Sequence, residues 1–399
     1  MLKKTRVLLA AIMLLVLSPA PVQAESALRV LDSSAEVEFP QRLTFNLSVE
    51  GESNITDIRL NYIVRMEGFT TVVSEGYVNF KPARRVAVSW PLEMVRINGL
   101  PPGTWVDYWW RVRDESGGEL VTPSAQIEFT DQGYPWQELT EGQVTIYWYE
   151  GGSSFAQTIM ASAQDGLARL SRDTGVTPAK PVRLFIYASP RDLLESMINP
   201  QEWTGGVHFA RFDVITIGIP LNELEWGKRA VVHELTHLII GQITFNPYSG
   251  LPVWLNEGLA VYNEGEFDPA LAQFLTQAIK ENSVISVRSL ASPFSALSSR
   301  AYLSYAESRE LVEFLISRYG SDKMFKLLLK FREGTSYDAA FMEVYGFDMD
   351  GLNTIWQETL KTPEPTGKVA YRPRFDSSAK SGFVPPLALG IGKYAFSRN

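Results

Sequence analysis

The sequence predicts an α+β protein in which an all-β region precedes a region of mixed strands and helices. Between about residues 26 and 131, apolar and polar residues alternate and turn signals recur, without helical periods. From residue 144 onward, short apolar strands are followed by segments whose apolar residues recur every three or four positions. The chain of 399 residues, with 45% apolar and 21% charged residues, is long enough for two or three domains with sizeable cores.

The first 24 residues have the features of an export signal peptide. Positive charges at Lys3, Lys4 and Arg6 precede an apolar segment of 11 residues, 7–17. Ala24 then offers a small residue after which cleavage is expected. A membrane span needs roughly 20 apolar residues, so this segment is too short to remain as an anchor. We therefore expect an extracytoplasmic protein, secreted or in the cell envelope, without a stable membrane span after signal cleavage.

The composition excludes several kinds of chemistry. The chain has no cysteine, which rules out disulfides, thiolate zinc ligands and a cysteine nucleophile. Its formal net charge is −8 and no basic patch or arm stands out, which argues against a nucleic-acid partner. An exported chain without disulfides must be held together by burial of apolar cores, which this length allows.

Residues 25–132 are expected to form an all-β sandwich domain. In one strand of it, Val106, Tyr108, Trp110 and Val112 share a face and alternate with a mostly polar face. Turn signals separate such strands, at residues 50–53, 100–103 and 116–118. The segment 101–131 resembles the last strands of a fibronectin type III or immunoglobulin-like module.

The tryptophans of this region have two interpretations, a carbohydrate-binding platform or a buried face of the sheet. The second is the commoner arrangement in β-sandwiches, and we favour it. Three roles stay open for the sandwich: recruitment of substrate, attachment to an envelope component, or support of the domain that follows.

Residues 135–361 are expected to form a second domain, joined to the first near residues 132–135. Its patterns predict a strand at 144–149, a helix at 154–173, a strand at 182–187, a short helix from Ser189-Pro190 and a hairpin within 205–218. Further helices are expected at 321–331, 337–345 and 349–360. Residues 362–399 are rich in Pro, Gly, Ser and Lys, and are expected to form a flexible C-terminal tail.

The segment HELTH, residues 233–237, is the strongest chemical signal in the chain. His233 and His237 are four positions apart, so both imidazoles project from one face of a helix and can reach one metal ion. Glu234 lies beside them, and this arrangement is that of zinc metallopeptidases, in which the carboxylate takes a proton from a metal-activated water. The alternative is an amphipathic helix with two buried or solvated histidines. The chain has only three histidines, which disfavours a chance match.

A hydrolytic zinc site needs a third protein ligand and one open position. Nineteen residues lie between His237 and Glu257, enough to end the first helix, turn, and bring a second helix back past the metal. The segment around Glu257, VWLNEGLAVYNEGE, resembles the aminopeptidase branch of the gluzincins, whose third ligand is a glutamate on such a helix. Residues 144–360 are similar to bacterial exported proteins described as the peptidase MA family.

This resemblance implies a zincin-type metallopeptidase domain, Zn2+ as cofactor, a polypeptide substrate and Glu257 as the third metal ligand. The alternative for Glu257 is an ordinary glutamate near a helix start. Thermolysin-like members of the clan carry an aspartate four residues after the ligand glutamate, where this chain has Val261. Glu264 and Glu266 are either groups that orient a histidine or solvated acids at a helix end, so the partner of the histidines stays unassigned.

The resemblance also implies an oxyanion donor. In the aminopeptidase branch a tyrosine at the head of a later helix supplies its phenol to the tetrahedral intermediate. Tyr305 matches that position best and Tyr302 is the second choice, while a tyrosine that merely fills the core is the competing explanation.

The hairpin at 205–218 separates the chain from the aminopeptidases. In zincins the edge strand at this place pairs with the substrate backbone. Aminopeptidases of the branch named above carry a G-x-M-E-N strand whose glutamate binds the free amino terminus of the substrate. The hairpin segment of this chain has no such glutamate, which favours an endopeptidase over an aminopeptidase. His208 in this hairpin either contacts a substrate or transition-state oxygen, or is a surface side chain. A non-catalytic binding protein on a degenerate peptidase scaffold is the alternative function.

Overall fold

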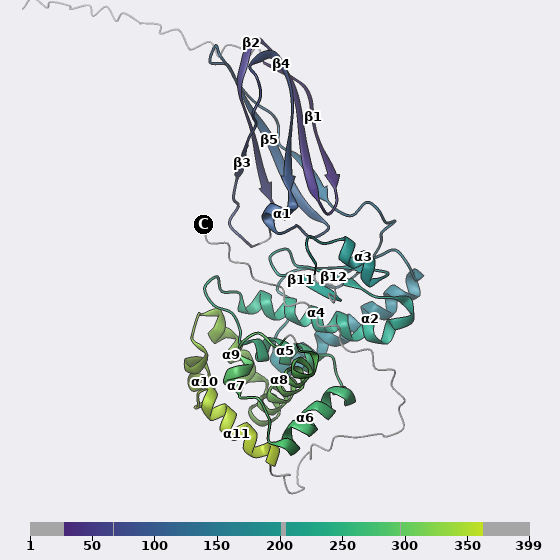
Figure 1. Cartoon of the computed structure of the whole chain (residues 1–399), viewed down its shortest axis with the longest axis vertical. Helices are drawn as coiled ribbons and strands as arrows, with labels where there is room; N and C mark the ends of the chain where they lie inside the picture. The colour runs from purple at the N-terminus through teal and green to yellow at the C-terminus, as the bar shows by residue number, and fades with distance from the viewer. Residues whose placement is uncertain (1–27, 67, 201–204, 296, 362–399) are drawn as a thin grey trace, which may run out of the picture.

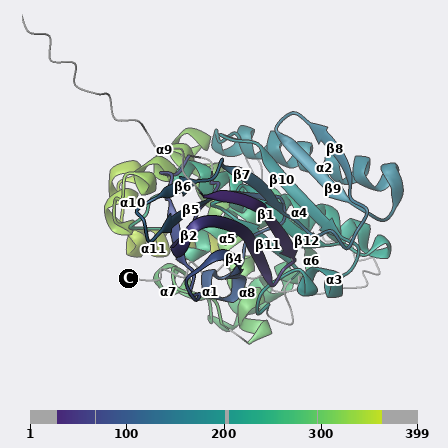
Figure 2. The ribbon, with the colours of Figure 1, turned by 90° about the horizontal axis from the view of Figure 1, so that it is seen from above.

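The computed structural model describes residues 28–361 except 67, 201–204 and 296. The predicted signal peptide and C-terminal tail therefore lie outside the described residues. A β-rich N-terminal region, a smaller sheet and a helical C-terminal region follow one another along the long axis (Figure 1). Figure 2 looks down this axis from the end where the β-rich region lies. No helix in the described part of the chain combines the length and the apolar character needed to cross a membrane.

Among its described residues, the β-rich region has seven strands: β1 (Arg29–Glu38), β2 (Arg42–Val64), β3 (Ser74–Tyr77), β4 (Ala83–Glu93), β5 (Thr104–Asp114), β6 (Glu119–Val121) and β7 (Ala125–Phe129), with the short helix α1 (Met94–Ile97) after β4. The first half of β2 pairs with β1 and β4, and its second half pairs with β3 and β5. The register shifts between Glu50 and Ile55, so one long strand serves two sets of neighbours.

The predicted alternation along β5 is confirmed. Val106, Tyr108, Trp110 and Val112 all point into one core, in which Trp110 is fully buried. The core also contains alternate residues from both halves of β2. Trp105 points the other way and is 41% exposed. The aromatic row of β5 is therefore a core face, as expected.

The second sheet is mixed and has the strand order β11-β12-β10-β9-β8. Its strands are β8 (Gln137–Glu141), β9 (Val144–Trp148), β10 (Val182–Tyr187), β11 (Gly206–Phe209) and β12 (Val214–Gly218). The central strand β10 is parallel to both β9 and β12, whereas β8 and β11 pair antiparallel at the two edges. The edge strand β11 is the first half of the predicted hairpin.

The helices are α2 (Gly152–Thr174), α3 (Pro190–Glu195), α4 (Leu224–Thr244), α5 (Val253–Asn263), α6 (Pro269–Glu281), α7 (Val287–Leu290), α8 (Ser298–Tyr319), α9 (Ser321–Arg332), α10 (Tyr337–Tyr345) and α11 (Met349–Lys361), with one 3₁₀ turn (Leu221–Glu223) before α4. α2 ends where Gly175 adopts the left-handed conformation, and its backbone N–H donates to Ser171. Ser189 caps α3 by accepting a hydrogen bond from the backbone N–H of Asp192. The sequence analysis did not anticipate α6 and α7.

The two faces of the mixed sheet have different neighbours. Alternate residues such as Ile146, Leu184 and Ile217 pack on α2 and α4 within the largest core. The opposite face carries an aromatic cluster around Phe185 and Tyr187. On that side Arg183 donates to the carbonyl oxygen of Gly103 at 2.6 Å, which ties the mixed sheet to the β-rich region.

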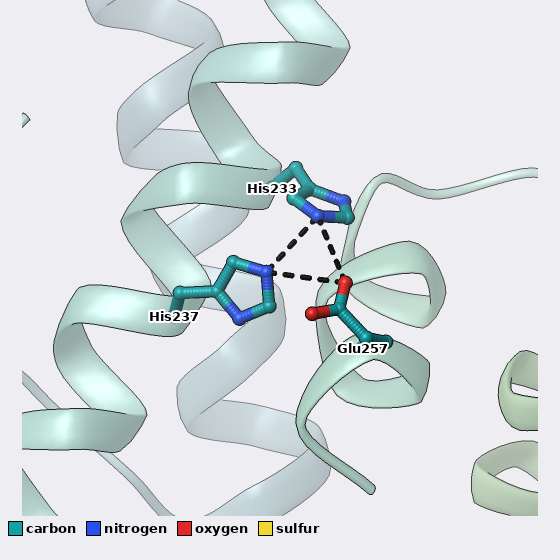
Figure 3. Close-up of side chains that lie close together, drawn as sticks. All are labelled: His233, His237 and Glu257. Carbon is teal, nitrogen blue, oxygen red and sulfur yellow. Dashed lines mark hydrogen bonds and ion pairs between the residues drawn. The ribbon is translucent and has the colours of Figure 1, made fainter. Parts of the chain in front are cut away.

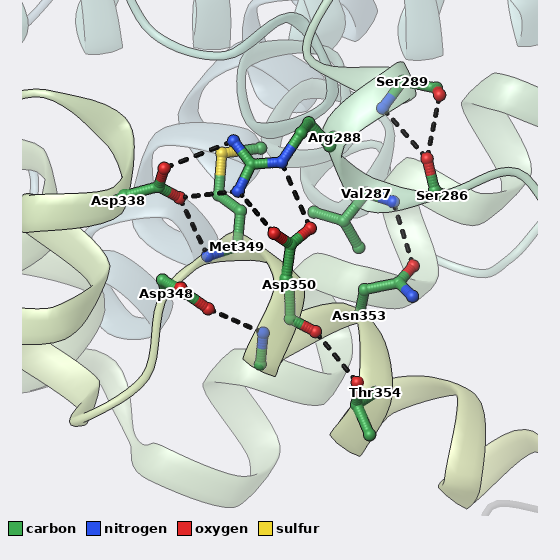
Figure 4. A network of polar contacts seen from close by, with 11 residues as sticks. Ser286, Val287, Arg288, Ser289, Asp338, Asp348, Met349, Asp350, Asn353 and Thr354 are labelled. Atoms are coloured by element: carbon green, nitrogen blue, oxygen red, sulfur yellow. Dashed lines mark hydrogen bonds and ion pairs between the residues drawn. The ribbon is translucent and has the colours of Figure 1, made fainter.

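One polar network fastens the C-terminal helices together (Figure 4). The Arg288 guanidinium of α7 pairs with Asp338 of α10 and with Asp350 of α11. The side-chain oxygen of Asn353, also on α11, accepts from the backbone N–H of Val287. These contacts hold the short helix α7 in place, close to the helices that carry the candidate site.

Candidate metal centre

Helix α4 carries the HELTH segment through the middle of the domain. Every residue from 230 to 240 is buried, so this part of the helix is surrounded by packed side chains on all sides. The three ionisable residues of the motif are buried as well: His233 is 1%, Glu234 1% and His237 5% exposed. Polar groups enclosed in this way need partners, and the partners come from other elements.

The structure brings His233, His237 and Glu257 together (Figure 3). The two Nε2 atoms are 3.0 Å apart, and Oε2 of Glu257 lies 3.6 Å from the first and 3.5 Å from the second. Three candidate ligand atoms therefore lie within 4.8 Å of one another. The predicted arrangement, with two histidines on one helix and a glutamate on the next, is the one observed.

Helix α5 is held close to its neighbours so that Glu257 reaches the histidines. A Cβ added at Gly258 would overlap the carbonyl oxygen of Ser308 on α8, so only glycine allows this approach of the two helices. Trp254 and Leu255 are fully buried on the same helix. Packing of α5 thus fixes the position of its carboxylate.

The donor set fits a cation. Oε2 of Glu257 is buried and has no hydrogen-bond partner among the residues that the structure describes. Two imidazole nitrogens with one carboxylate oxygen are ligands that zinc prefers. Burial opposes ionisation of the Glu257 carboxyl, but the nearby histidines outweigh it and hold its pKa well below the usual range. Burial likewise opposes protonation of His233, yet its two carboxylate neighbours raise its pKa to about 10. The Glu257 carboxyl is therefore ionised and can act as an anionic ligand.

Glu264 is a site residue whose role the sequence analysis left open. Its Oε1 lies 2.8 Å from Nδ1 of His233, so the carboxylate accepts the Nδ1 proton and turns Nε2 toward Glu257. Val261, where the resemblance to thermolysin-like proteins would place an aspartate, packs instead in an apolar cluster. Glu266 is exposed. The seven-residue spacing from Glu257, two helical turns, is the signal that places Glu264 on the same side of α5.

A hydrogen-bonded brace holds the end of α5 against α4. The side-chain amide of Asn263 donates to Oγ1 of Thr236 at 2.7 Å, and both residues are buried. Arg169 of α2 donates to the backbone carbonyl of Asn263. Because Asn263 directly precedes Glu264, this brace positions the carboxylate that holds His233. The sequence analysis did not identify it.

His208 reaches Glu234 from strand β11. Its Nδ1 lies 3.2 Å from Oε2 of Glu234, and its side chain is 13% exposed, so its interpretation as a surface side chain is wrong. Burial, the largest influence, raises the pKa of the Glu234 carboxyl. The hydrogen bond from His208 and the charges of the three histidines together outweigh burial, so that this pKa lies below its usual value.

Tyr305 lies on α8, 8% exposed, with its ring edge-on to Phe294. Burial raises the pKa of this phenol well above its usual value, and the charges of three acidic residues add to the shift: Glu257, Glu234 and Glu264. Tyr305 is thus within electrostatic reach of the cluster. Tyr302, the second candidate, packs against Phe274, and burial is what raises its pKa.

The chain belongs to the Peptidase MA superfamily, whose model matches residues 162–362, half of the chain. The matched segment contains all the residues of the cluster, which defines the class as a peptidase-like domain of that superfamily. Among curated proteins no match was found.

Likenesses to solved structures are remote. Catalytically inactive OgpA from Akkermansia muciniphila, solved with an O-glycopeptide substrate, shares 8% identity at a TM-score of 0.20; the match covers 27% of this chain and 29% of that chain. The third fibronectin III domain of human KIAA0343 protein shares 13% identity at a TM-score of 0.19, and the match covers 28% of this chain and 86% of that chain. A family 56 carbohydrate-binding module, a β-1,3-glucan binding domain, shares 13% identity at a TM-score of 0.16, and the match covers 24% of this chain and 96% of that chain. At these TM-scores the likenesses carry no argument.

Proposed function

We propose that this protein is a zinc-dependent metallopeptidase of the gluzincin type, with His233, His237 and Glu257 as the metal ligands. The observation that carries the proposal is the convergence of two Nε2 atoms and one carboxylate oxygen in a buried site, where that oxygen has no hydrogen-bond partner within the described part of the chain. Membership of the Peptidase MA superfamily supports it.

The residues around the cluster then have distinct roles. Zinc bound there would polarise the scissile carbonyl and lower the pKa of a water molecule toward about 7. Glu234 accepts the proton of that water and delivers it to the leaving amine. Tyr305 donates its phenol proton to the developing oxyanion. The burial of all these groups excludes bulk water and strengthens each electrostatic contact.

The substrate proposed is an internal segment of a polypeptide. Strand β11 forms one edge of the mixed sheet, so its outer backbone groups can pair with an extended peptide by strand addition. No glutamate occurs in the hairpin segment 205–218 to bind a free amino terminus. These two features support an endopeptidase rather than an aminopeptidase.

The proposal includes export, which rests on the pattern of residues 1–24 alone. The β-rich region would then be a fibronectin III-like module that supports the peptidase domain or attaches it to an envelope component. Mass spectrometry of protein expressed with its leader tests this: cleavage after Ala24 is the expected result.

The test of the peptidase activity is the variant Glu234→Gln. It should bind zinc in the same stoichiometry as the wild type and lose cleavage of casein and of a diverse peptide library. Glu225→Gln is the matched control, because Glu225 lies on the same helix with its side chain 82% exposed. Wild-type rates of cleavage by Glu234→Gln would show that the base is wrongly assigned. Library products released only from the amino terminus would contradict endopeptidase action.

A further inference from the structure

Strand β11 contacts the side chain of Glu234 at two positions. Gly206 and His208 are two residues apart, and side chains at that spacing project from the same face of a strand. A Cβ added at Gly206 would lie 3.2 Å from Cγ of Glu234, and Nδ1 of His208 lies 3.2 Å from its Oε2. One face of this edge strand therefore borders the carboxylate on α4.

The hydrogen bond from His208 is the stronger of the two contacts. The Glu234 side chain is only 1% exposed, so its carboxylate has lost most of its water and depends on protein donors. His208 supplies such a donor to Oε2, whereas Oε1 is buried and has no hydrogen-bond partner among the described residues. The two oxygens are therefore not equivalent: one is held and the other is free to accept a proton.

Gly206 limits the space around the same group. The added Cβ would lie in ordinary van der Waals contact with Oε1, at 3.4 Å, but its distance of 3.2 Å from Cγ is tighter than usual. Any larger side chain at this position would press on the carboxylate that the neighbouring imidazole holds. The glycine thus allows β11 to lie close enough for His208 to reach Oε2.

We propose that His208 is a positioning residue for Glu234. Its Nδ1–H donates to Oε2, which fixes the rotation of the carboxylate and leaves Oε1 as the oxygen that receives the proton of the attacking water. The proposal rests on the proposed function and deepens it, because it assigns the two oxygens of the base and the residue that distinguishes them. No covalent bond to His208 forms or breaks.

Two substitutions of the full-length, zinc-loaded protein test the positioning role. His208→Ala removes the donor, and kcat should fall about 10- to 100-fold because the base is no longer held in position. KM and zinc content should not change, since Glu234 binds neither the substrate nor the metal. His208→Asn places an amide N–H near the position of Nδ1 and should restore most of the kcat. Arg211→Ala, an exposed residue in the turn of the same hairpin, is the control and should match the wild type.

The proposal is overturned if His208→Ala keeps the wild-type kcat, or if His208→Asn is as slow as His208→Ala. Loss of zinc in both variants would also overturn it, since His208 would then act on the metal site as a whole.

A second measurement does not depend on activity. The chain has three histidines, so nitrogen-15 NMR of the tag-free protein can follow each ring, and the His208 signals are those lost in His208→Asn. We expect the proton on Nδ1 in the zinc-loaded wild type and a mixture of tautomers in Glu234→Ala. An unprotonated Nδ1 in the wild type overturns the hydrogen bond. A wild-type protein that cleaves no peptide overturns the proposed function instead. In that case His208 has no role in catalysis, even if the NMR experiment finds its hydrogen bond to Glu234.

Discussion

Nδ1 of His233 lies 2.8 Å from Oε1 of Glu264, whereas Nδ1 of His237 is buried without a hydrogen-bond partner among the described residues. The two imidazoles that face the same centre are therefore held in different ways. A carboxylate orients His233, while packing within the core orients His237. Removal of that carboxylate should affect the metal centre without touching a ligand.

The first prediction concerns Glu264→Ala. Loss of the Nδ1 partner should weaken zinc binding about 10- to 100-fold, because the carboxylate both orients the ring and raises its basicity. Competition with a chelator of known affinity measures the change. Glu266→Ala is the matched control, since Glu266 is exposed two residues further on. Equal zinc affinity of the two variants would show that the hydrogen bond does not support the metal centre.

The ease of prediction differed among the residues of this site. His233 and His237 are related by local helical geometry, so the pattern itself brought them together. Glu257 required a family resemblance, because its distance from the histidines depends on how α4 and α5 pack. The contact of Glu264 with His233 depends on the same packing, and the contact of His208 with Glu234 depends on how a sheet edge lies against a helix.

The fold shows the same division between local and long-range information. Strand β10 and helix α10 coincide with the predicted ranges, because each has a clear apolar period. Strand β8 was not anticipated, since its sequence QELTE is polar and lacks an apolar face. Helix α6 was also missed, although Asp268 and Pro269 form an ordinary helix start in which the aspartate accepts from the backbone N–H of Ala270.

The second prediction tests the proposed role of Tyr305 as the oxyanion donor. Tyr305→Phe removes one hydroxyl and should lower kcat about 10²- to 10³-fold, with little change in KM, because the donor acts only in the transition state. Steady-state kinetics on one defined peptide substrate measure this. Tyr302→Phe is the control, and its kcat should stay within about twofold of the wild type. A larger loss in Tyr302→Phe would exchange the roles of the two tyrosines.

The third prediction concerns the contact between α5 and α8. Gly258→Ala should lower the free energy of unfolding by about 1–3 kcal/mol, because the added methyl group overlaps the backbone of Ser308 and forces the helices apart. Zinc content should fall as well, since Glu257 moves with α5.

Gly241→Ala is the matched control for this substitution. Gly241 lies within α4, and an added Cβ there would meet no atom of another element within 4 Å among the described residues. Alanine should therefore be neutral or stabilise by about 0.5–1 kcal/mol through its helix propensity. Chemical denaturation of the two variants, followed by tryptophan fluorescence, compares them. If the two alanines had the same effect, close packing at Gly258 would not be what positions Glu257.

The last prediction concerns a buried acid outside the candidate metal centre. Glu307 on α8 is 0% exposed, and its carboxylate oxygens accept from the backbone N–H of Ile285 at 3.0 and 3.2 Å. Burial is the main cause that raises its pKa to about 8, while the hydrogen bond from Ile285 opposes this. The folded protein therefore holds a proton that the unfolded chain, with the ordinary carboxyl value of 4.5, releases.

The sign of the pH dependence follows from this difference. Between about pH 4.5 and pH 8 the folded state binds one proton more than the unfolded state, so this group's contribution to stability is complete below that window and is lost as pH rises through it. Glu307→Gln is always neutral and its side-chain oxygen can still accept from Ile285. Its stability relative to the wild type should therefore increase with pH, by at most about 1.4 kcal/mol per pH unit.

Urea denaturation at pH 5, 6.5 and 8 measures this increase. Glu358→Gln, at an exposed position on α11, is the control and should show no increase. A constant difference between Glu307→Gln and the wild type over this range would show that Glu307 is ionised in the folded protein.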